Sequence, residues 1–229
     1  MAPTLSGPRL PARSGKAKQL VVFLHGYGAS GDDLIDIGRQ WQGLLPDAAF
    51  VAPHAPEPCG MGGGGRQWFA LTFRDADERW RGVTQARPTL DAFLNAELAK
   101  QNLTDADLCL VGFSQGTMMA LHTGLRRNIA PAAIVGYSGQ LVGPEHLSEA
   151  KARNSKGAPP PVLLVHGDMD EVLTVDNLFL SADALGKADI PCEWHLSLGI
   201  GHGIDQGGLV HGGLFIAQRF GVKVQLKAR

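Results

Sequence analysis

The chain has almost no net charge and no long apolar run, and each shortage excludes a class of protein. Its 229 residues contain 21 Lys and Arg against 22 Asp and Glu, which gives a formal net charge of -1. Without a basic excess, the electrostatic basis for non-specific nucleic-acid binding is missing. No segment approaches the roughly 18 uninterrupted apolar residues that a transmembrane helix needs. We therefore expect neither a nucleic-acid partner nor a membrane span.

Cysteine is also scarce. The chain has three, Cys59, Cys109 and Cys192, and they are widely spaced. Such a set makes neither a complete disulfide framework nor a paired-ligand zinc pattern. No two histidines stand four residues apart beside a glutamate, so the chain lacks the metal-ligand pattern of a metallohydrolase. The first residues hold prolines and basic side chains but no apolar stretch of signal-peptide length. We expect a soluble cytoplasmic protein with idle thiols, no metal and no cofactor.

Short β-rich runs alternate with longer helical patterns along the rest of the chain. Hydrophobic residues make up 44% and charged residues 19%, and the length suits one α/β domain over residues 1–229. The order strand, helix, strand predicts a mostly parallel sheet with helices on both faces. Residues 1–18 would form an N-terminal extension or edge strands, and 143–161 a surface excursion. The expected strands are 19–25, 49–53, 107–113, 132–138, 161–167 and 192–198, and the expected helices are 84–101, an amphipathic helix directly after 113, 175–187 and 208–220.

The segment GFSQG at 112–116 joins an expected strand to an expected helix. In that context the pattern Gly-x-Ser-x-Gly forces the serine into a strained conformation, with its hydroxyl above the sheet. The flanking glycines leave room for the tight turn. A rival serine, Ser138 in GYSGQ, lacks the second glycine. We interpret Ser114 as a nucleophile, against the alternative of a plain strand-to-helix cap.

A serine nucleophile needs a base and an acid that orients the base, and both should follow it in the chain. His202 lies in a glycine-rich segment between the last expected strand and the last expected helix, where a loop could reach over the tight turn at 112–116, called the elbow below. The acid should follow an earlier strand, and HGDMDEV offers two candidates, Asp168 and Asp170. Spacing does not choose between them.

Acyl transfer also requires preorganised donors for the negative oxygen that develops in the transition state. One is the backbone N–H of Gln115, the residue after the nucleophile. The second should come from the glycine-rich loop at 25–31, where Gly26, Tyr27 and Gly28 all remain open.

Seven segments, in order along the chain, resemble landmarks of the carboxylesterase, lysophospholipase and acyl-protein thioesterase family: LHGYG, APHAP, RQWF, GFSQG, YSG, HGDMDEV and GHGI. The resemblance implies a compact α/β-hydrolase fold without a large cap domain. It also implies Asp170 as the acid and the N–H of Tyr27 as the second oxyanion donor. The chain departs from the family pattern at Tyr27, Ala29 and Thr117, where the family usually has leucine, aspartate and glycine.

The function expected from these residues and this resemblance is that of a serine carboxylesterase acting on short- to medium-chain esters through an acyl-enzyme. The alternatives are an acyl-protein thioesterase or lysophospholipase on the same fold, and a non-catalytic binding module. The partner would be a small ester or acyl-thioester, and the resembled family also allows a homodimer. Trp68, Phe69 and Phe73 are candidates for an apolar acyl-binding wall, or else pin a long loop to the body.

Overall fold

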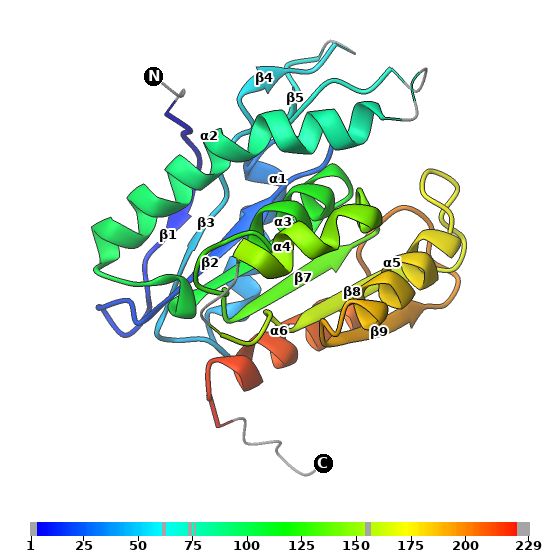
Figure 1. The fold of residues 1–229 in the computed structure, drawn as a ribbon. Helices are drawn as coiled ribbons and strands as arrows, with labels where there is room; N and C mark the ends of the chain where they lie inside the picture. Colours follow the sequence, from blue (N-terminus) through cyan, green and yellow to red (C-terminus); the bar gives the residue numbers. More distant parts are fainter. Residues whose placement is uncertain (1–3, 61–62, 73–74, 76, 154–156, 224–229) are drawn as a thin grey trace.

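A seven-stranded sheet forms the centre of the protein in the computed structural model, which describes residues 4–60, 63–72, 75, 77–153 and 157–223 (Figure 1). The strand order is β1-β3-β2-β6-β7-β8-β9, and every pairing is parallel except that of β1 with β3. The expected mostly parallel sheet is confirmed. The strands are β1 (Arg9–Leu10), β2 (Gln19–Leu24), β3 (Ala48–Val51), β6 (Leu108–Phe113), β7 (Ala133–Tyr137), β8 (Val162–Gly167) and β9 (Cys192–Ser197).

Helices cover both faces of this sheet, as expected (Figure 1). One face carries α2 (Glu78–Gln101), α3 (Gln115–Gly124), α4 (Leu147–Arg153) and α5 (Asp176–Lys187), and the other carries α1 (Asp32–Trp41) and α6 (Gln206–Arg219). Each face has its own cluster of buried apolar side chains. Two 3-10 turns, η1 (Asp105–Asp107) and η2 (Pro144–His146), and a small ribbon of β4 (Glu57–Pro58) with β5 (Arg66–Gln67) complete the fold.

The central strands place several loops along one edge of the sheet. β2, β6, β7 and β8 are buried along almost their whole length, as their valine-rich sequences predict. Their parallel register aligns Phe113 with Tyr137, and Tyr137 with Val165. The segments after residues 24, 113, 137, 167 and 197 therefore emerge side by side at the carboxyl ends of the strands. Ligands of open α/β sheets bind at this edge.

Several elements differ from the sequence expectations. α2 begins at Glu78 rather than at 84, and Gly82 in its added turn lets the ring of Phe69 pack against the helix backbone. Helix α1 was not expected at all. α3 is buried on every side rather than amphipathic, because it lies between the sheet and α2. The excursion at 143–161 contains η2 and α4. Among the described residues, no helix is both long and apolar enough to cross a membrane.

Candidate active site

Ser114 lies at a sharp turn between β6 and α3, in the strained backbone that its motif predicts. Its φ of 53° and ψ of -115° are unusual for a residue with a side chain. The two glycines of the motif are required by space. A Cβ at Gly112 would lie 2.4 Å from the backbone of Thr117, and one at Gly116 would lie 1.8 Å from the carbonyl oxygen of Leu24. The elbow is therefore wedged against the neighbouring strand and its own helix.

His202 reaches the serine from the loop between β9 and α6. Its Nε2 lies 3.0 Å from the Ser114 Oγ, and its Nδ1 lies 2.7 Å from Oδ2 of Asp170. The ring packs at 5.1 Å, centroid to centroid, against that of Phe113. The three side chains thus form one hydrogen-bonded line from serine through imidazole to carboxylate, on segments 88 and 32 residues apart in sequence.

Asp170 is fully held by hydrogen bonds. Its Oδ1 accepts the backbone N–H groups of Val172 and Leu173, both at 2.9 Å, and its side chain has no solvent exposure. Burial alone would raise its pKa, but the hydrogen bonds from His202 and from the two N–H groups outweigh burial and hold the pKa below its ordinary value. The carboxylate therefore stays ionised at neutral pH.

The second aspartate of HGDMDEV faces elsewhere. Asp168 is exposed, and its Oδ1 accepts the backbone N–H of Gly199 at 2.6 Å. This bond, with that from the Met169 N–H to the Ile200 carbonyl at 2.9 Å, ties the loop of the acid to the loop of the histidine. Of the two candidates that spacing left open, the structure brings Asp170 to His202.

His166, the first residue of the HGDMDEV segment, is a further buried residue of this site. Its Nε2 lies 2.7 Å from the carbonyl oxygen of Leu173 and 3.2 Å from Oδ2 of Asp170, the oxygen that also receives His202. A carbonyl oxygen only accepts, so Nε2 carries the proton. The Nε2–H of His166 therefore contacts both the carboxylate of Asp170 and the carbonyl of Leu173, at the two ends of the turn that holds Asp170. Its place four residues before Asp170 was the available signal.

The loop of His202 is anchored on both sides. The hydroxyl of Ser138, the rival serine, donates to the carbonyl of Gly203 at 2.8 Å. Asp205 caps α6 by accepting the N–H groups of Gly207 and Gly208, and it also accepts the hydroxyl of Ser197 at 2.6 Å. The Ser138 hydroxyl therefore anchors the loop of His202 and does not contact the imidazole.

The candidate oxyanion donors come from the elbow itself and from the loop after β2. Gln115 is the first residue of α3, where a backbone N–H has no partner within the helix and the helix dipole favours negative charge. Tyr27 lies in the loop after β2 and is half-buried. The side-chain amide of Gln115 is also engaged, because its Oε1 accepts the Trp68 N–H at 2.9 Å.

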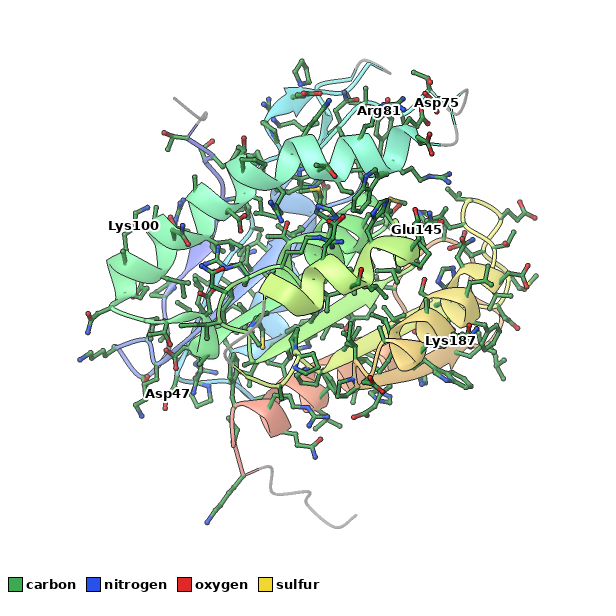
Figure 2. All side chains as sticks on the ribbon, in the orientation of Figure 1. Asp47, Asp75, Arg81, Lys100, Glu145 and Lys187 are labelled. Carbon is green, nitrogen blue, oxygen red and sulfur yellow. The ribbon has the colours of Figure 1, made fainter. Side chains whose placement is uncertain are left out.

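The candidate acyl wall is largely buried. Trp68 is 2% and Phe69 5% exposed, and Phe73 lies outside the described residues. Both aromatics border a cleft of about 650 Å³ between their loop and α2, whose rim includes the ion pair of Asp75 and Arg81 at the start of α2 (Figure 2). Ser114, His202 and Asp170 do not line this cleft. The acyl wall stays a prediction.

The fold and this site together define a class of protein. A mostly parallel sheet with a serine on a strained turn, followed in the chain by an acid and a histidine, is the α/β-hydrolase arrangement. The chain belongs to the phospholipase/carboxylesterase family, whose sequence model matches residues 6–218. The expected family and the expected fold class are thereby confirmed. Among the described residues, no three His, Cys, Asp or Glu side chains are grouped to share a metal ion.

The similar proteins include both esterases and thioesterases. Esterase YpfH of Escherichia coli (strain K12) is 27% identical over 190 residues, or 82% of this chain and 78% of that protein. Acyl-protein thioesterase 1 of Yarrowia lipolytica is 28% identical over 216 residues, or 87% of this chain and 91% of that protein.

Among solved structures, esterase PE8 is 45% identical, with a TM-score of 0.86 over 94% of this chain and 99% of that one. The structure of Arabidopsis thaliana SOBER1 is 23% identical, with a TM-score of 0.72 over 88% of this chain and 99% of that one. At this identity the similarity supports the fold alone.

Proposed function

We propose that the protein is a serine carboxylesterase that hydrolyses short- to medium-chain esters through an acyl-enzyme, with Ser114 as nucleophile, His202 as base and Asp170 as acid. The observation that carries the proposal is the continuous hydrogen-bonded line through these three side chains, at 3.0 Å and 2.7 Å. The reaction class, hydrolysis of carboxylic esters, is that of the family and of the relatives named esterase and thioesterase.

The geometry supports a two-step reaction. His202 Nε2 takes the proton of Ser114 as the hydroxyl attacks the ester carbonyl, and the ionised Asp170 stabilises the imidazolium that forms. The N–H groups of Gln115 and Tyr27 would bind the oxyanion. The imidazolium then protonates the leaving alcohol. A water molecule, activated by the same imidazole, hydrolyses the acyl-enzyme and restores the serine.

A thioester substrate is the second candidate, because the same acyl-enzyme forms from either leaving group. The acyl-protein thioesterase relatives favour it, and esterase PE8, at 45% identity, favours the ester. We further propose one domain over residues 1–229, a cytoplasmic location and a homodimer; a gel-filtration mass equal to that of the 24.3 kDa chain would refute the dimer.

The test is hydrolysis of p-nitrophenyl esters from acetate to dodecanoate by the wild type and by Ser114→Ala, alongside a matched acyl-thioester and a lysophospholipid. We expect the variant to lose at least about 10³-fold in kcat, with only binding and the oxyanion hole left to act. Equal rates would remove Ser114 from the mechanism. Turnover confined to thioesters or to lysolipid would move the assignment to the corresponding alternative, and failure to hydrolyse any of them would favour a binding module.

A further inference from the structure

We propose that Trp68 is a positioning residue for the oxyanion hole, rather than part of an acyl-binding wall. Its indole N–H and its backbone connect the two loops that carry the proposed donors, the N–H groups of Gln115 and Tyr27. The inference rests on the proposed function, since it assigns a role within that reaction. It is carried by hydrogen bonds that join almost wholly buried side chains to backbone groups of neighbouring loops.

The first connection runs from the elbow to the loop of Trp68. The Gln115 side chain, on a residue 1% exposed, accepts the backbone N–H of Trp68 at 2.9 Å and donates to the carbonyl of Phe69 at 2.8 Å. The amide thus pairs with the backbone as a neighbouring strand would. Gln115, whose N–H is one of the two proposed donors, therefore fixes Trp68 through its own side chain.

The second connection runs from Trp68 to the loop after β2. The indole Nε1–H donates to the carbonyl oxygen of His25 at 2.9 Å. Because a peptide group is planar and trans, fixing that carbonyl also fixes the N–H of Gly26 on its opposite side. His25 is buried, so the indole N–H supplies the hydrogen bond that water would give to its carbonyl. Leaving this buried carbonyl unpaired would cost stability.

The ring of His25 extends the same control by one peptide. Its Nε2 accepts the N–H of Ala55 at 2.9 Å, so its Nδ1 carries the proton that is donated to the Gly26 carbonyl at 2.7 Å. Burial lowers the pKa of His25, which favours this neutral form. The Gly26 carbonyl points toward the ring, and the Tyr27 N–H across the same peptide therefore points away from it.

These bonds place the two donors in one rigid frame. A donor that is preorganised costs no reorganisation when charge develops, and this is the main source of its effect on rate. Losing the indole N–H would loosen one donor relative to the other without removing either. A loss of this kind lowers kcat and leaves KM unchanged, because the oxyanion exists only in the transition state.

The experiment compares Trp68→Phe with a matched control, Trp41→Phe. Trp41 is also a buried indole that donates to a carbonyl, that of Leu209 at 3.1 Å, but it packs in the core cluster on the other face of the sheet. Both variants keep an aromatic ring and lose one N–H. The readouts are kcat and KM for p-nitrophenyl esters from acetate to dodecanoate, thermal unfolding, and inhibition by an alkyl trifluoromethyl ketone, whose tetrahedral adduct carries an oxyanion.

We expect Trp68→Phe to lower kcat about 10-fold at every chain length, part of the 10²–10³-fold cost of losing a whole donor. KM and the chain-length profile should not change, and inhibition by the ketone should weaken by the same factor. Trp41→Phe should keep its kcat. An unchanged kcat in Trp68→Phe overturns the proposal, and so does a changed KM with a shifted chain-length optimum, which is the result for an acyl wall. An equal fall in both variants would attribute the effect to stability and also overturn it.

Failure of the proposed function would look different. Both tryptophan variants keep Ser114, and should still be labelled by a fluorophosphonate that Ser114→Ala does not take up. If Ser114→Ala hydrolyses esters at the wild-type rate, the mechanism itself is wrong. If Ser114→Ala is inactive and Trp68→Phe is fully active, the mechanism stands and the role of Trp68 is wrong.

Discussion

Asp170→Asn is the substitution whose effect follows most directly from the hydrogen bonds of the site. The two backbone N–H groups of Val172 and Leu173 require an oxygen at the Oδ1 position, so the amide nitrogen of the asparagine must take the Oδ2 position. An N–H group there faces His202 Nδ1 at 2.7 Å and forces that nitrogen to accept. The proton then moves to Nε2, the atom that must take the proton of Ser114. The imidazole is held in the wrong tautomer.

The expected loss is about 10⁴-fold in kcat, equivalent to about 5 kcal/mol of transition-state stabilisation, as for the wrong-tautomer asparagine variant of a serine protease. The control is Asp168→Asn, where the amide oxygen can still accept the Gly199 N–H and the residue is exposed. We expect that variant to stay within about twofold of the wild type. The assay is steady-state p-nitrophenyl ester hydrolysis near neutral pH. A small effect of Asp170→Asn, or an equal loss in Asp168→Asn, would refute the assignment of the acid.

Three further predictions concern the elbow, the turn that holds Asp170, and the ion pairs of the buried Glu97 with two partly exposed cations. Gly116→Ala places a Cβ 1.8 Å from a backbone carbonyl and should destabilise by more than about 3 kcal/mol, whereas Gly186→Ala, with nothing within 4 Å, should cost nothing measurable in urea unfolding. His166→Phe removes the N–H beside the acid and should lower kcat about tenfold, and His166→Gln, which can place an N–H there, should recover most of it; identical rates in both would deny the role. Burial alone would raise the pKa of Glu97, but the hydrogen bonds from Arg9 and Lys100 outweigh burial and lower the pKa. The ion pairs therefore stabilise the fold at pH values above the ordinary Glu pKa of 4.5, and this contribution is lost as the pH falls through the lowered pKa. Glu97→Gln should therefore cost about 1–3 kcal/mol near neutral pH and progressively less in acid, and a cost that did not vary with pH would contradict this.

The proximity of Ser114, Asp170 and His202 could be predicted from sequence because each follows an expected strand, although only the strands before Ser114 and Asp170 are buried apolar runs. The runs before Ser114, Asp170 and His202 end at or near the carboxyl edge of the sheet, so their order along the chain fixes their neighbourhood. The choice of Asp170 over Asp168 was not available from spacing, because both aspartates follow the same strand. It depends on which carboxylate accepts the Val172 N–H, and that carboxylate is the one of Asp170.

Other features depend on packing that the sequence pattern hides. Helix α1 was missed although Leu34, Ile37 and Trp41 have helical spacing, because Gly38 interrupts the stripe; that glycine is needed for close approach to Phe50. α3 showed a single apolar face in sequence, but tertiary contacts bury its polar positions as well. Boundaries such as the start of α2 depend on contacts with a distant loop, which local propensity does not report.

The loop aromatics show the same limit at the site itself. An aromatic cluster beside a glycine-rich segment predicts equally a substrate wall or a buried anchor. For Trp68 the facts that favour an anchor are its 2% exposure and the partner of its indole N–H, both of which depend on chain segments far away in sequence. Tertiary hydrogen bonds of this kind have no sequence period.

The most direct test of the central claim is peptide mapping of the protein after reaction with a fluorophosphonate. We expect one adduct, on the peptide that contains Ser114, formed in step with the loss of ester hydrolysis. We also expect His202→Ala to form the adduct far more slowly, because the imidazole no longer activates the hydroxyl. An adduct on Ser138 or on another residue, or full ester hydrolysis by a protein already labelled at Ser114, would show that Ser114 is not the nucleophile.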